Sequence, residues 1–439
     1  MNRVKSTLAA LIGNALEYYD VTLYAFFSAI FAKLYFPSDD PYMSQIMALG
    51  AFAAGATMRP IGGMVFGHIG DRYGRKTALV LAVLLVSLPT TIMGLLPTYA
   101  SIGIAAPIIL VLCRLLQGLC TGGEYAGASV FILEHSRGKK SGFFCSLLPT
   151  SSLSGALLGT LIGVICTQDT MPESPWSIPY LLGGLICTQE TILENAWRIP
   201  FLLGGVFGII GFFVRRMVPE SPDFVDMKQQ KKVSKFPLLK ALRRDWKSAL
   251  CTMGISINNL AHFYLVVAFM IPFALPEGIS LHNKMIINSS FLAMLAITFP
   301  LMGYLGDKIG VRRVMLISAL LIIVFAIPVL WAVMQFQDIL SEIILVSIFA
   351  LLGTGMIAGS ASFTPRMYHS QDRYSGLAVS TGLGDMIGIS TPLVATWLVA
   401  QTGIKIAPAF YMVFIGVIAL ISVKCAPIFY NPKTKDQTA

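Results

Sequence analysis

The sequence predicts an all-α polytopic membrane protein in which twelve transmembrane helices form two six-helix bundles. Three observations carry this prediction: an apolar composition, twelve apolar runs, and a charged turn that recurs in the second half of the chain. Of the 439 residues, 55% are hydrophobic and 12% are charged, whereas soluble chains contain about 25% charged residues. This composition excludes a soluble domain, a disordered chain and a coiled coil.

The apolar runs lie between breaks that are rich in charged residues, Pro, Gly, Asn and Asp. A helix crosses a bilayer with about 20 largely apolar residues, which is roughly the length of each run. No cleavable signal precedes the first run, so we expect it to remain as a span. The predicted spans are 7–36, 42–69, 77–97, 103–134, 141–166, 198–217, 248–276, 285–306, 314–336, 339–365, 374–401 and 407–429.

Positive charge is concentrated in alternate loops, and most of the 32 Lys and Arg residues fall on one side of the predicted membrane. By the positive-inside rule, that side is the cytoplasm. We therefore expect a multi-pass protein of the plasma (inner) membrane with both termini and the central linker in the cytoplasm. The net charge of +10 reports orientation in the lipid bilayer, so we expect no nucleic-acid partner.

A charged turn after the second predicted span recurs after the eighth. The offset is 303 − 67 = 236 residues, and each copy stands at the same place in its half. Glycines in such a turn permit close helix packing and positive φ angles. The first copy contains Gly67, Asp71, Arg72, Gly74 and Arg75, and the second contains Gly303, Asp307 and Arg312.

Six spans on either side of a basic segment predict two parallel repeats with the substrate site between them. The N-terminal bundle contains a local tandem duplication at 163–204, in which 13 of 21 positions match. The inserted stretch from Trp176 to Leu185 is about ten residues, too short to span, so we expect an outside loop or a shallow re-entrant piece. An amphipathic surface helix is expected near 236–246. The predicted domains are the N-terminal bundle 1–217, the cytoplasmic linker 218–247, the C-terminal bundle 248–430 and the cytoplasmic tail 431–439.

The repeated pattern G-x-x-x-D-[RK]-x-G-[RK]-[RK] resembles the signature of the major facilitator superfamily. The resemblance implies the major facilitator fold and transport by alternating access. Further stretches are similar to its metabolite:proton symporter subfamily, and 122–136 (GGEYAGASVFILEHS) most resembles the proline/betaine transporters. These further stretches begin at Gly13, Arg59, Arg114 and Trp197.

The same resemblance implies that the charged turn is a gate. Asp71 would face the start of the eleventh span, and Arg75 would pair with an acid at the cytoplasmic end of the fourth, where Glu134 stands. The second copy is expected to be weaker, because Pro365 and Arg366 stand where the family usually has an acid or Phe-Pro. The alternative is that the basic residues of the turn only fix topology.

Polar residues recur at three-to-four-residue intervals on the first and fourth spans, so each span has one polar face. A charge at membrane depth usually lines a cavity, and these residues are therefore candidates for function. The alternative is a buried ion pair that only locks the bundle. The first face carries Asn14, Glu17, Asp20 and Tyr24, and the second carries Arg114, Gln117 and Glu124.

Three carboxyls are candidate proton carriers, namely Glu17, Asp20 and Glu124, and a carboxylate paired with Arg114 would be less fit for that role. Arg114 suits a substrate carboxylate through its bidentate geometry, and tyrosine rings could receive a cationic nitrogen. The remaining C-terminal polar positions include His262, expected to be a packing residue, and Asp385, which departs from the family. The predicted substrate residues are Arg114, Asn14, Gln117, Tyr18, Tyr24, Tyr125, Asn258 and Asn259.

These observations predict proton-coupled symport of a small zwitterionic metabolite, such as proline or a betaine, by a monomer that needs no cofactor or metal. One alternative is symport of an organic anion, for which Arg59 and Arg114 would both bind carboxylates. A second is a non-transporting receptor. An enzyme is not expected, because the five His and seven Cys form no metal or nucleophile cluster in the sequence.

Overall fold

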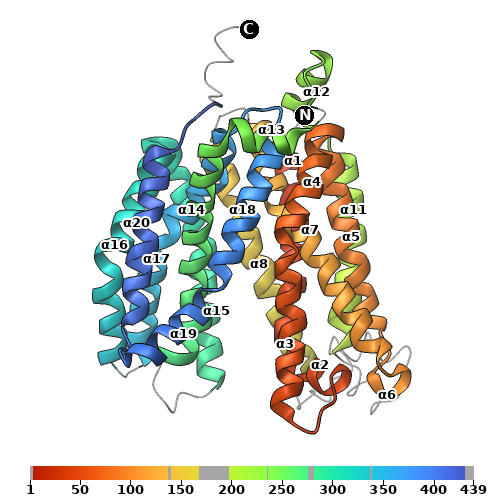
Figure 1. The fold of residues 1–439 in the computed structure, drawn as a ribbon, viewed down its shortest axis with the longest axis vertical. Helices are drawn as coiled ribbons and strands as arrows, with labels where there is room; N and C mark the ends of the chain where they lie inside the picture. Colours follow the sequence, from red (N-terminus) through yellow and green to blue (C-terminus); the bar gives the residue numbers. More distant parts are fainter. Residues whose placement is uncertain are drawn as a thin grey trace.

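The computed structural model describes residues 3–136, 140–167, 197–234, 236–274, 281–336 and 339–430. These residues form helices joined by turns and short loops, without a β-strand among them (Figure 1). Most of the duplicated segment and the predicted tail at 431–439 lie outside the described residues.

The N-terminal half contains the helices of the first six predicted spans. The first two spans are each divided into two helices. The first divides near Phe27, and the second divides at Met58, two residues before Pro60. A helix α6 (Tyr99–Ile102) occupies the loop before the fourth span. The span helices are α1 (Arg3–Phe26) with α2 (Ser28–Tyr35), α3 (Pro41–Thr57) with α4 (Arg59–Tyr73), α5 (Arg75–Leu95), α7 (Ala105–Ser136), α8 (Ser141–Thr167) and α11 (Arg198–Met217).

The C-terminal half repeats this arrangement. Its first span changes from α-helix to π-helix after Tyr264, and its fifth divides at Ser390. The linker between the halves forms α12 (Pro222–Gln229) and α13 (Pro237–Arg244). The span helices are α14 (Trp246–Tyr264) with η1 (Leu265–Ala274), α15 (Leu281–Ile309), α16 (Val311–Gln335), α17 (Ile339–Phe363) followed by η2 (Thr364–Met367), α18 (Arg373–Ile389) with α19 (Thr391–Thr402), and α20 (Ala407–Cys425).

Ten helical stretches in the described part of the chain are long and apolar enough to cross a bilayer. The first two predicted spans complete the twelve, although each is divided into two helices and both contain charged residues. Helix α1 carries Glu17 and Asp20 inside its apolar sequence, and α4 begins at Arg59 and contains Asp71. The molecule is therefore a multi-pass membrane protein.

The two halves stand side by side, with α8 near the centre between them (Figure 1). Two helix pairs join the halves, because α4 packs along α18 and α8 packs along α15. Helices α12 and α13 lie at the end of the bundle where α1 begins and α20 ends (Figure 1). This end carries the basic linker, and we call it the linker end.

Candidate functional site

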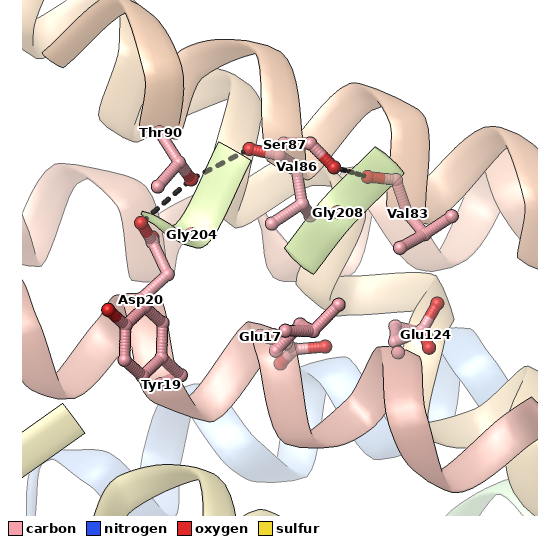
Figure 2. Close-up of a pocket in the computed structure, with 12 residues that line it drawn as sticks. Glu17, Tyr19, Asp20, Val83, Val86, Ser87, Thr90, Glu124, Gly204 and Gly208 are labelled. Carbon is pink, nitrogen blue, oxygen red and sulfur yellow. Dashed lines mark hydrogen bonds between the residues drawn. The ribbon is translucent and has the colours of Figure 1, made fainter. Parts of the chain in front are cut away.

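A small cavity whose lining includes charged side chains lies where the two halves meet. Most of its wall comes from α1, α3, α4, α5 and α7 of the N-terminal half, and α14 and α18 complete it. A second, adjoining cavity shares Glu17 and Asp20 with the first and adds Glu124 (Figure 2). The first cavity is lined by Glu17, Asp20, Val21, Phe52, Gly55, Ala56, Arg59, Val86, Arg114, Gln117, Gly118, Thr121, Tyr264 and Ile389.

Arg114 is held by its own half of the molecule. Its Nη1 lies 3.5 Å from a carboxylate oxygen of Asp20 and donates a 2.8 Å hydrogen bond to Gln117. The guanidinium also lies 4.3 Å from the ring centre of Tyr24 and 4.9 Å from that of Phe52. These contacts occupy much of the Arg114 guanidinium, the group that the sequence predicts to bind a substrate carboxylate.

Thr90 ties Asp20 to this cluster. Its hydroxyl donates a 2.7 Å hydrogen bond to the Asp20 carboxylate and accepts one of 3.0 Å from the Gln117 amide. Figure 2 shows the Asp20 side chain directed toward Thr90 and away from Glu17. Asp20 therefore belongs to a closed network with Arg114.

Glu17 is different from the other two predicted proton carriers. Its side chain is 3% exposed and lines both cavities. Within the described residues, it forms no ion pair within 4 Å, and its Oε2 has no hydrogen-bond partner. Glu17 is thus a buried carboxyl with an unused oxygen at the cavity wall.

Glu124 pairs with Arg215. Arg215 lies in the last turn of α11 and is 2% exposed. Its other N–H groups donate to the backbone carbonyls of Ala9, Ala10 and Leu79 at 2.6–3.1 Å. All five guanidinium donors are used, two of them on Glu124. The position of Arg215 inside the predicted span 198–217 is the signal that could have revealed its burial.

Several predicted substrate residues lie in helix contacts. Asn14 donates from Nδ2 to the Leu148 carbonyl and to the hydroxyls of Ser151 and Ser152 on α8. The Tyr24 hydroxyl donates to the Ala48 carbonyl at 3.0 Å. The structure therefore places Asn14 at a helix–helix contact and Tyr24 beneath Arg114.

The C-terminal polar residues are also separate from the cavity lining. Asn259 donates a 2.9 Å hydrogen bond to Ser360, and Asn258 is buried with no hydrogen bond to its amide in the described structure. His262 contacts the Ala350 carbonyl and stacks on Phe349, which confirms its packing position. The two remaining predicted substrate residues, Tyr18 and Tyr125, belong to the N-terminal half, where they are partly buried on α1 and α7.

One contact across the cavity joins the two halves. Arg59 at the start of α4 lies 3.9 Å from Asp385 of α18, and Tyr18 and Tyr264 are close to both charges. This pairing is not predicted from the sequence, in which Asp385 only departs from the family pattern.

The contacts predicted for the charged turn are present at the linker end. Asp71 accepts hydrogen bonds of 3.2 and 2.8 Å from the backbone N–H groups of Tyr374 and Ser375 at the start of α18. Arg75 lies 2.8 Å from Asp71 and 3.6 Å from Glu134. The contacts are confirmed, and their role in gating stays a prediction.

The second copy makes the equivalent contact in the opposite direction. Asp307 accepts hydrogen bonds of 2.7 and 2.9 Å from the backbone N–H groups of Gly142 and Phe143 at the start of α8. Arg312 donates to the backbone carbonyls of Val423 and Lys424 in the last turn of α20 and of Ala426 just after it. The hydrogen bonds of Asp307 are as short as those of Asp71. The expected weakening of the second copy therefore does not extend to its carboxylate contact.

The remaining turn residues fit the close packing. Gly74 has a φ of +119°, a value that favours glycine. Gly67 and Gly303 approach Ser375 and Gly142 so closely that a side chain would not fit. Arg72 is exposed.

Helix α13 forms at 237–244, as the sequence predicts. Its Arg244 lies 2.8 Å from Asp372, and Lys240 donates a 2.7 Å hydrogen bond to Gln371. Burial raises the pKa of Asp372 to about 6, although the positive charge of Arg244 lowers it. The linker is thereby joined to the segment just before α18.

We expect Asp71→Asn to slow transport at normal membrane abundance, because an amide binds the two backbone N–H groups of α18 more weakly than a carboxylate. Hydrogen bonds to charged groups contribute about 1.5–3 kcal/mol each, so the linker-end contact should open more readily. Initial uptake rates and surface abundance measure the effect. Arg72→Gln is the matched control in the same turn, and equal rates for both variants would contradict a gate function.

Known proteins match this chain over both halves. A family profile described as "Sugar (and other) transporter" matches residues 5–250, and one described as "Major Facilitator Superfamily" matches residues 260–438. The proline/betaine transporter of Salmonella typhimurium is 33% identical over 95% of this chain and 82% of its own length. The glycine betaine/proline/ectoine/pipecolic acid transporter of Dickeya dadantii is 32% identical over the same shares.

Solved structures share the fold. A proton:xylose symporter, XylE, bound to 6-bromo-6-deoxy-D-glucose, superposes with a TM-score of 0.70 at 16% identity over 96% of this chain and 94% of that chain. FucP, a transporter captured in the outward conformation, gives a TM-score of 0.65 at 13% identity over 95% and 98%. The identities are low, so these structures inform the fold alone.

Proposed function

Since this chain belongs to the major facilitator superfamily and is a transporter rather than an enzyme, we propose that it is a proton-coupled symporter of a small zwitterionic metabolite. Proline and glycine betaine are the substrates to test first, because both relatives above are named for them. The observation that carries the proposal is the cavity between the halves, which offers both signs of charge to one solute.

Alternating access is supported by the distribution of contacts between the halves. At the linker end, Asp71 binds the start of α18, and Asp307 binds the start of α8. Glu134 of α7 also lies 2.7 Å from Arg373 of α18. A conformation that exposes the cavity to the linker side has to break these contacts. By the positive-inside rule, that side and both chain ends are proposed to be cytoplasmic.

Glu17 is the proposed proton carrier. A carrier has to face the solute pathway and be able to exchange its proton when the pathway opens. Asp20 and Glu124 are engaged by Arg114 and Arg215, whereas Glu17 lines the cavity without an ion pair in the described structure. A proton on Glu17 removes the charge that would otherwise be buried alone.

The energy of one proton is sufficient for uptake of a neutral zwitterion. Moving one charge through 100 mV supplies about 2.3 kcal/mol, or roughly a fifty-fold gradient. The proton gradient is the only drive that the proposal requires.

Proteoliposomes with an imposed pH gradient test the function. We expect accumulation of labelled proline or betaine, and no accumulation of dicarboxylates, because Arg114 is already held by Asp20 and Gln117. Accumulation of a dicarboxylate instead would favour the organic-anion alternative. Protein that folds normally but moves none of these solutes would favour a receptor.

Glu17→Gln should abolish accumulation driven by the pH gradient and retain solute counterflow, because the amide cannot exchange a proton. We expect at least a tenfold fall in the accumulation ratio, since the roughly fifty-fold proton drive is lost. Uptake and counterflow in the same vesicles measure the two activities separately. Asp39→Asn, at an exposed loop position, is the matched control. Undiminished pH-driven accumulation by Glu17→Gln would assign the proton to another group.

A further inference from the structure

Arg59 is the cavity cation with the most binding capacity left. Arg114 makes a hydrogen bond, an ion pair and two aromatic contacts. The Arg59 guanidinium makes no hydrogen bond to any residue that the structure describes, and Asp385 is the acid nearest to it at 3.9 Å. That distance is too long for a hydrogen bond, so all the guanidinium donors of Arg59 remain available.

The Arg59–Asp385 pair is accessible, unlike the ion pairs of the gate. The Arg59 and Asp385 side chains are 13% and 21% exposed, whereas those of Arg75 and Asp71 are 0% exposed. Arg59 lines the cavity, as do Tyr264 and Ile389 on the side of Asp385. Arg59 is thus reached directly from the cavity, and the partly exposed Asp385 lies beside it.

The pair sits where irregular helices meet. Helix α4 starts at Arg59 after the break at Met58, and the π-helix η1 starts directly after Tyr264. The α18–α19 break at Ser390 follows Asp385 by little more than a turn. Irregular backbone at membrane depth is characteristic of transporter binding sites, and π-helices are frequent at functional sites.

Helices α4 and α18 also pack along one another from this pair to the gate. Gly382 approaches Pro60, next to Arg59, while Gly63 approaches Ala378 farther along the same contact. Asp71 then binds the first turn of α18. A change at the Arg59–Asp385 pair therefore acts directly on the helix pair that the gate holds together.

On the basis of the proposed function, we propose that Arg59 and Asp385 are the two poles of the substrate site. The substrate carboxylate binds the Arg59 guanidinium, and its cationic nitrogen lies beside Asp385, with the rings of Tyr18 and Tyr264 nearby. The zwitterion then replaces one weak ion pair with two, without changing the net charge of the cavity. An anion that lacks the nitrogen cation would take Arg59 and leave Asp385 as an unpaired buried charge. The pair thus selects zwitterions over anions.

Isosteric probes test this assignment. Replacing the nitrogen of glycine betaine with carbon gives 3,3-dimethylbutanoate, and the corresponding analogue of proline is cyclopentanecarboxylate. Inhibition of betaine or proline counterflow by each analogue in proteoliposomes yields a ratio of affinities for zwitterion and anion. We expect the wild-type chain to prefer the zwitterion and Asp385→Asn to lower that ratio at least about tenfold. Asp385→Glu retains the charge and should retain most of the preference.

A variant with a purely structural defect would lose affinity for both probes and keep their ratio. A folded Asp385→Asn variant whose ratio stays within about twofold of wild type, while the wild-type chain transports zwitterions, would overturn this inference alone. A wild-type chain that binds neither proline nor betaine would overturn the proposed function as well. If Asp385→Asn does not fold, Asp385→Ser is measured in its place and is expected to show the same loss of preference. Retained preference in Asp385→Ser would overturn the inference.

Discussion

Replacing Arg215 with Met should leave little folded protein in the membrane. The change removes the only ion-pair partner recorded for Glu124 in the described structure and frees three backbone carbonyls that Arg215 binds, those of Ala9, Ala10 and Leu79. Breaking a buried ion pair by removing one partner typically costs about 3–5 kcal/mol of folding stability. We expect a loss of that size here. Thermal unfolding of the purified protein and its yield from membranes measure the loss.

A double variant separates the lost pair from other effects. Glu124→Gln/Arg215→Met leaves neither charge alone and should recover part of the stability lost in the single variant. Arg216→Met is the matched control, because Arg216 is the exposed neighbour of Arg215 at the end of α11. A single variant as stable as this control would show that the Glu124–Arg215 pair does not lock the N-terminal half.

The second large effect is expected from a side chain at Gly67. A Cβ at that position would lie 2.6 Å from the Cα of Ser375, which is backbone and cannot turn aside. Overpacking of this kind costs about 1–3 kcal/mol or more, and Gly67→Leu should therefore separate α4 from α18 at the linker end. We expect uptake to fall by roughly ten- to a hundredfold, because the conformation with the linker end closed becomes rare.

Labelling of a cysteine placed in the cavity measures this shift. In a Thr121→Cys background, an impermeant thiol reagent should react faster from the linker side and more slowly from the opposite side when Gly67→Leu is present. Gly50→Leu in α3 is the control, because a Cβ there meets no atom within 4 Å. Unchanged labelling from both sides would mean that the α4–α18 contact does not close the pathway.

The positions of the membrane spans could be predicted from the sequence, because membrane thickness imposes a length on each apolar run. The break of α18 at Ser390 and the switch to π-helix after Tyr264 were not predicted, because run length alone defined each span as one continuous helix. The contacts of Asp71 and Glu134 were predictable because the repeated turn resembles a known family motif.

Side-chain partners were harder to predict, because the sequence does not state which helices are neighbours. Asn14 was correctly expected to face inward, but it contacts α8 and not the cavity. Glu124 and Arg215 are separated by 91 positions, and nothing in the sequence of either span names the other as its partner. Arg59 and Asp385 come from different halves and meet only after the bundles assemble.

The two carboxylates at the linker end make reciprocal contacts. The N-terminal half contributes Asp71 and receives Asp307 at its α8, while the C-terminal half contributes Asp307 and receives Asp71 at its α18. A rigid rotation of one half that frees one carboxylate also pulls on the other. Under the proposed alternating access, the entrance on that side would therefore switch between two positions, shut and open, and a partly released arrangement would be short-lived.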